Sequence, residues 1–194
     1  LCYNLVIFNI MDDTKSMKYQ PIPDSRAIND KLLNITIPSI SLPNQTGNLL
    51  KLNRDDTFRL VFYFYSMTGH PKKKLPEGWS KIPGAEGCTL ENSIFRDNYE
   101  NLIELNALPI GISTQTIDEI RDMTDYLGIK YDVLSDFNLL CVKKLSLPTF
   151  SIGDKIFIKR ISIIVENNII KKVFYPIVSI NKHIDEVLKW LKKN

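Results

Sequence analysis

The sequence contains one continuous apolar run that is rich in aromatic side chains, Leu60-Val61-Phe62-Tyr63-Phe64-Tyr65. An apolar run of this length, with no alternating polar residues, is typical of a strand that is covered on both of its faces. We therefore predict that residues 60–65 form a strand at the centre of a sheet.

Strand and helix patterns alternate along the chain outside this run. The sequence predicts a helix over 89–106, a strand over 108–113, and a helix that begins with the capping box Thr116-Ile117-Asp118-Glu119. Further on, Asn167-Asn168 tolerates positive φ between two apolar segments, 158–165 and 169–175, which predicts a hairpin. This succession favours an α/β fold over an all-α or all-β fold.

Composition excludes several classes of protein. With 194 residues, 44% hydrophobic and 24% charged, the chain is neither collagen-like nor disordered, and its length suits one domain. The formal net charge of +3 gives no argument for nucleic acid as a partner. No uncharged apolar run approaches the ~20 residues of a membrane span, so we expect no membrane association.

The N-terminal part of the chain differs in character from the rest. Residues 1–10 are uncharged and mostly apolar, and residues 11–34 are polar, Pro-punctuated and without periodicity. We therefore predict a loosely packed extension over 1–34 and a single folded domain over 35–194. Three widely spaced cysteines, Cys2, Cys88 and Cys141, fit a reducing compartment better than a disulfide framework. We expect a cytoplasmic protein, with an organelle as the alternative because of the atypical extension.

A Gly- and Pro-punctuated segment, residues 69–87, follows the central strand directly and predicts a long loop. Cys88 comes at its end and at the start of the next helix. Backbone N–H groups and the helix dipole stabilise a thiolate at such a position. From position alone, a reactive thiol and a buried packing cysteine are equally good interpretations of Cys88.

Two blocks of sequence carry a family signature. The first is Gly87-Cys88-Thr89-Leu90-Glu91 followed by Ile94-Phe95-Arg96-Asp97, and the second runs from Lys159-Arg160 through the apolar strands to the helix around Trp190. Together they resemble the peroxiredoxins of the bacterioferritin-comigratory, or Q, type, including a redoxin-like branch with an insertion in the active-site turn. The resemblance implies a thioredoxin-like, three-layer α/β fold with a central mixed sheet flanked by helices.

The same resemblance implies a thiol-dependent peroxidase, which reduces hydrogen peroxide or organic hydroperoxides through a cysteine sulfenic acid. Cys88 is then the nucleophile, and Arg160 is the cation that stabilises the departing oxygen and lowers the pKa of the thiol. No cofactor is expected. No metal is expected either, because the chain has only two histidines and no cysteine pair at ligand spacing. The supporting residues that we expect at this site are Thr68, Gly87, Thr89, Glu91 and Arg96.

Glu91 lies one helical turn after Cys88, and we expect it to orient Arg160, with Arg96 as a further partner. For Glu91 and Arg96, a solvent-facing salt bridge is an equally good interpretation. The family pattern Pro-x-x-x-Thr-x-x-Cys is interrupted, because Ala85 stands three residues before Cys88. We therefore assign the peroxide-binding threonine to Thr68, separated from Cys88 by the insertion.

The absence of a second, resolving cysteine at the usual position is the other departure from the family pattern. In the Q type it often lies five residues after the first cysteine, where this chain has Ser93. Cys141 is interpreted as a packed core thiol, with a resolving role as the alternative. We therefore predict a one-cysteine cycle, with a thioredoxin-type protein or a small thiol as reductant, and leave a homodimer open.

The main alternative function belongs to a different class. The interrupted threonine motif and the missing second cysteine favour a non-catalytic thioredoxin-fold module that binds a partner or senses redox state through Cys88. The retained Cys88 and Arg160 favour the enzyme, since a binding module needs neither. A thiol-disulfide oxidoreductase is excluded for lack of a Cys-x-x-Cys pair.

Overall fold

The computed structural model describes residues 25–54, 57–69 and 74–194. Its centre is a mixed five-stranded sheet with the order β5-β4-β3-β8-β9. The parallel strands are β3 (Arg59–Phe64), β4 (Ala107–Ser113) and β5 (Val133–Ser135), and β8 (Ile161–Glu166) runs antiparallel to β3. The outer strand β9 (Ile169–Phe174) completes the predicted hairpin with β8. The prediction that the apolar run forms the sheet centre is confirmed.

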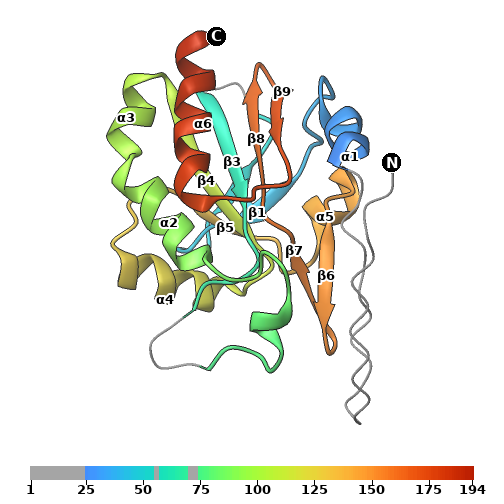
Figure 1. The fold of residues 1–194 in the computed structure, drawn as a ribbon. Helices are drawn as coiled ribbons and strands as arrows, with labels where there is room; N and C mark the ends of the chain where they lie inside the picture. Colours follow the sequence, from blue (N-terminus) through green and yellow to red (C-terminus); the bar gives the residue numbers. More distant parts are fainter. Residues whose placement is uncertain (1–24, 55–56, 70–73) are drawn as a thin grey trace.

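Helices cover both faces of this sheet, which gives the three layers seen in Figure 1. One face carries α2 (Cys88–Asp97), α3 (Tyr99–Glu104), α4 (Ile117–Leu127) and the C-terminal α6 (Ile180–Lys193). The other face carries α1 (Ser25–Leu32) and α5 (Leu140–Leu145). The predicted α/β fold with a central mixed sheet between helices is confirmed.

The side chains of β3 alternate between two separate cores. Leu60, Phe62 and Phe64 pack in the core under α1 and α5. Val61 and Tyr63 pack in the other core, under α2 and α6. Because successive side chains of a strand point to opposite faces, the sheet itself separates the two cores.

The predicted N-terminal boundary is wrong for residues 25–34. These residues form α1, whose Ile28 and Leu32 are buried in the first core, and Asn34 donates its backbone N–H to Ile170 O at 2.9 Å. Ile28 and Leu32 lie one helical turn apart, and two apolar residues among polar ones are too weak a pattern to predict a helix. The rest of the predicted extension, residues 1–24, lies outside the described residues.

Three other elements differ from the sequence prediction. The helix predicted over 89–106 divides into α2 and α3 at Asn98, whose side chain donates to Ile94 O at 3.0 Å and so competes with the helical backbone pattern. The strand predicted over 158–165 divides at Lys159-Arg160. Only its first residue, Ile158, belongs to β7 (Lys155–Ile158), which pairs with β6 (Thr149–Ile152) in a hairpin that the sequence analysis does not predict.

The two short strands expected around the turn at 45–48 are present as β1 (Ser41–Pro43) and β2 (Leu49–Lys51). The segment predicted as a loop after β3 contains one turn of 3-10 helix, η1 (Trp79–Lys81). Among the described residues, no helix is both long enough and apolar enough to cross a bilayer.

Candidate active site

Cys88 is the first residue of α2, directly after a left-handed turn at Gly87. Gly87 has φ 93°, and its carbonyl accepts the N–H of Glu91 at 2.9 Å, which closes the first helical turn. A Cβ atom on Gly87 would also clash with Ile180 Cδ1 at the start of α6, so that the end of this side chain would have to move. The backbone conformation therefore requires glycine before the cysteine.

Arg160 reaches Cys88 from the short connection between β7 and β8. Its Nη2 lies 3.4 Å from Cys88 Sγ, and its Nε donates to Glu91 Oε2 at 2.8 Å. All three side chains are buried, with Arg160 6% exposed and Cys88 2% exposed. The structure thus brings together the three side chains that the sequence predicted at the centre of the site.

The loop before Cys88 completes the environment of the guanidinium. Arg160 Nη1 donates to Gly84 O at 3.1 Å, and Nη2 also donates to Glu86 O at 2.9 Å. Between them, the carbonyl of Ala85 accepts from Cys88 Sγ at 3.5 Å. The sequence could not predict the role of these carbonyls, because every residue type has a backbone carbonyl.

Opposing effects act on the thiol. Burial raises the pKa of Cys88 above its ordinary value, and the negative charge of Glu91 adds to this increase, while the Arg160 guanidinium lowers it. Smaller lowering contributions come from the backbone N–H groups of Met67 and Ser66. Arg160 therefore acts in the predicted direction on the thiol pKa, but burial outweighs it in this closed arrangement.

Glu91 is the buried counter-charge of Arg160. Burial raises the pKa of Glu91 to about 7, against the lowering effect of the neighbouring guanidinium. Within the described part of the chain, its second oxygen, Oε1, is buried without a hydrogen-bond partner. The pair is thus a buried charged unit and not the solvent-facing salt bridge that was its alternative interpretation.

Arg96 does not join this unit, which corrects the sequence prediction. Its Nε donates to Asp97 Oδ1 at 2.8 Å and its Nη1 to Leu127 O at 2.6 Å. Since Arg96 and Glu91 are five positions apart, they project from different sides of the helix, whose neighbours lie three and four residues apart.

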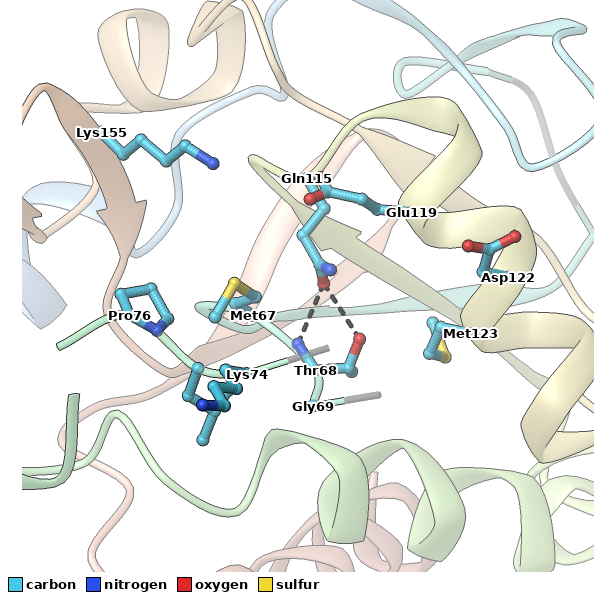
Figure 2. Close-up of a pocket in the computed structure, with 11 residues that line it drawn as sticks. Met67, Thr68, Gly69, Lys74, Pro76, Gln115, Glu119, Asp122, Met123 and Lys155 are labelled. Atoms are coloured by element: carbon cyan, nitrogen blue, oxygen red, sulfur yellow. Dashed lines mark hydrogen bonds between the residues drawn. The ribbon is translucent and has the colours of Figure 1, made fainter. Parts of the chain in front are cut away.

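The two threonines of the predicted site have partners outside the Cys88–Arg160 pair. Thr68 donates both its N–H, at 3.0 Å, and its hydroxyl, at 3.1 Å, to Gln115 Oε1, as the dashed lines in Figure 2 show. Thr89 Oγ1 accepts the N–H of Gly69 at 3.1 Å and so ties the first turn of α2 to the end of the central strand segment. Gln115 was missed because no motif marks it. Peroxide binding by Thr68 stays a prediction.

A cavity of about 130 Å³ lies beside Thr68. Figure 2 shows Met67, Thr68 and Gly69 along it, with Lys155 of β7 reaching toward Gln115. No cluster of three or more metal-ligating side chains occurs in residues 25–54, 57–69 and 74–194.

The chain is similar in sequence to known proteins. No family model matches the chain. Peroxiredoxin Bcp of Escherichia coli is 28% identical over 165 residues, which cover 81% of this chain and 93% of that protein. The chloroplastic peroxiredoxin Q of Suaeda salsa is 26% identical over 155 residues, covering 80% of this chain and 65% of the relative.

The fold comparison points the same way. The crystal structure of peroxidoxin BcpB from Mycobacterium tuberculosis superposes with a TM-score of 0.67 at 22% identity, over 83% of this chain and 96% of the other. In sequence and in fold, the chain is similar to peroxiredoxins. Within them, its relatives are those of the bacterioferritin-comigratory, or Q, type.

Proposed function

We propose that the chain is a thiol-dependent peroxidase that reduces hydrogen peroxide or an organic hydroperoxide with Cys88. The observation that carries the proposal is the contact of 3.4 Å between Arg160 Nη2 and Cys88 Sγ, with the guanidinium held by Glu91 at 2.8 Å. A buried cation fixed beside a buried thiol favours a thiolate and a developing negative charge at the same place. The non-catalytic module has no use for this arrangement.

The chemical step needs few groups. The Cys88 thiolate attacks the distal oxygen of the hydroperoxide, so that an S–O bond forms while the O–O bond breaks. The departing alkoxide or hydroxide takes up a proton and leaves as alcohol or water, and Cys88 becomes a sulfenic acid. Arg160 stabilises the negative charge that moves from sulfur to the departing oxygen.

The return to the thiol requires a reductant, and we infer that it comes from outside the chain. Cys141 packs in the core under α1 and α5, whereas Cys88 packs in the core under α2 and α6. The central sheet lies between these cores, and a disulfide needs Cα atoms within about 7 Å. Ser93, at the usual position of a resolving cysteine, donates its hydroxyl to Thr89 O at 3.0 Å and offers no sulfur for a disulfide. The remaining cysteine, Cys2, lies outside the described residues.

The reductant that fits this cycle is a thioredoxin-type protein or a small thiol. Its thiolate attacks the sulfenic sulfur, water leaves, and a mixed disulfide forms. A second thiol then releases reduced Cys88. The cycle balances with two electrons from two thiols for each peroxide.

A comparison of cysteine variants tests the proposal. We expect Cys88→Ser to abolish single-turnover peroxide reduction by the reduced protein, because Cys141, the other described thiol, has the Asp136 carboxylate beside it and not a cation. Cys141→Ser and Cys2→Ser are the matched controls and should keep the wild-type rate. Wild-type activity in Cys88→Ser would refute the peroxidase assignment.

A further inference from the structure

The insertion before Cys88 is anchored by a small aromatic cluster of its own. Trp79 is 3% exposed, and its ring centroid lies 5.8 Å from that of Phe150 and 5.1 Å from that of Phe157 on the β6–β7 hairpin. Ala85 completes the cluster, which is separate from the two cores of the sheet. Burial of an aromatic ring against two others is a strong and directional anchor.

A series of hydrogen bonds leads from this anchor to the reactive thiol in steps of three residues. Ile82 donates its N–H to Trp79 O at 3.1 Å, and Ala85 donates its N–H to Ile82 O at 3.1 Å. The next step is the bond of 3.5 Å from Cys88 Sγ to Ala85 O. Trp79 is thus joined to Cys88 through consecutive turns of the backbone.

Ala85 connects the cluster to the guanidinium as well. Its side chain is fully buried in the cluster, and its two neighbours in the chain, Gly84 and Glu86, present the carbonyls that accept from Arg160 at 3.1 and 2.9 Å. Two of the contacts that orient Arg160 therefore depend on where the cluster holds Ala85.

Building on the proposed function, we infer that Trp79 is a positioning residue for peroxide reduction. Packed against the rings of Phe150 and Phe157, Trp79 fixes the 84–86 backbone, which orients Arg160 and covers the Cys88 thiol. A misplacement of about 1 Å in such a constellation can lower a rate by about 100-fold. Trp79 acts through this backbone and not by contact with the peroxide.

Truncation of Trp79 tests the inference, with Trp190→Ala as the matched control. Trp190 is the chain's other tryptophan. It lies ten residues beyond Ile180 along α6, about 15 Å from the end of the helix that meets Gly87. We expect Trp79→Ala to slow single-turnover peroxide reduction at least about tenfold, Trp79→Phe to restore most of the rate, and Trp190→Ala to leave it unchanged.

Site-resolved alkylation by iodoacetamide distinguishes positioning from general destabilisation. In Trp79→Ala, Cys88 should react several-fold faster than in the wild type, because its cover is loosened, while Cys141 stays protected. Equal exposure of both cysteines, or a wild-type peroxide rate with wild-type protection of Cys88, would overturn the inference. The alkylation result does not depend on peroxidase activity. An inactive wild type would instead count against the proposed function.

Discussion

The two described cysteines occupy sites that are alike in burial and opposite in charge. Both thiols lie in the first turn of a helix, Cys88 in α2 and Cys141 in α5, and burial raises the pKa of both. Cys88 faces the Arg160 guanidinium, which lowers its pKa. Cys141 has Asp136 beside it, whose charge raises the pKa further.

The difference shows that a buried cysteine at a helix start is not reactive by position alone. In the first turn of α5, the N–H groups of Cys141 and Val142 donate to the Asp136 carboxylate, each at 3.1 Å. Of the two sites, only that of Cys88 has a fixed cation. The loop before Cys88 contributes to the same distinction, because the carbonyls of Gly84 and Glu86 hold that cation in place. Arg160 is therefore the residue on which the comparison depends most.

Removing the cation should have the largest effect on this comparison. We expect Arg160→Met to lower the peroxide rate by about 100-fold or more, the size expected for loss of one preorganised charge-stabilising donor. The pKa of Cys88 should rise in the same variant, and that of Cys141 should not move. Arg96→Met is the control, since Arg96 pairs with Asp97. A normal rate with an unshifted Cys88 titration would make Arg160 a purely structural residue.

Distortion of the turn before Cys88 should have the next largest effect. In Gly87→Ala, the strained φ and the contact with Ile180 should destabilise the fold by about 1–3 kcal/mol, and peroxide reduction should slow. Gly47→Ala carries nearly the same positive φ, 88°, with open space around its Cβ, so it controls for conformational strain alone. Equal losses of thermal stability and rate in the two variants would show that the approach of α6 does not matter.

The sequence predicted the parts of this site that are side chains in a motif, and missed the parts that are backbone or packing. Cys88, Arg160 and Glu91 were predicted and lie together. The prediction that Arg96 joins this group, which came from the family signature, is wrong, because its spacing of five residues from Glu91 directs it elsewhere. The carbonyls of 84–86 have no residue signature.

Fold prediction shows the same division. The central strand and the β8–β9 hairpin could be predicted, because continuous apolar runs and Asn167-Asn168 are local signals. The hairpin of β6 and β7 could not be predicted in this way. Phe150 and Phe157 do not form a continuous apolar run, and they pack against Trp79, which lies about 70 residues earlier in the chain. The helix α1 likewise depends on a distant partner, β9.

A smaller difference between the two cysteines should appear in the pH dependence of their reactivity. The rate of peroxide reduction should rise with pH, because the thiolate is the nucleophile and burial raises the pKa of Cys88. In Glu91→Gln this profile should shift to lower pH, because the charge that raises the thiol pKa is gone. The maximal rate should fall, since Arg160 loses its charged partner. An alkylation profile of Cys88 that is unchanged or shifted to higher pH would contradict this account.

The last prediction concerns the stability of the fold in acid, which has the smallest bearing on the comparison of the two cysteines. His183 is buried, its Nε2 lies 2.9 Å from Ser162 Oγ, and burial lowers its pKa to about 4. Between about pH 6.5 and 4, His183 is therefore protonated in the unfolded chain and neutral in the folded chain. Stability should fall as the pH drops through this range, by up to about 3 kcal/mol. Urea unfolding of His183→Gln should show a flatter acid limb, and identical slopes would contradict the prediction.

The most direct test of the central claim is peptide mapping after one equivalent of peroxide, with a dimedone trap for sulfenic acid. The account predicts the trapped adduct on Cys88, unmodified Cys141, and no disulfide between Cys88 and another cysteine of the chain. With excess peroxide and no reductant, Cys88 should proceed to sulfinic acid. An adduct mainly on Cys141 would contradict the contrast between the two sites, and a Cys88–Cys141 disulfide as the main product would contradict the one-cysteine cycle.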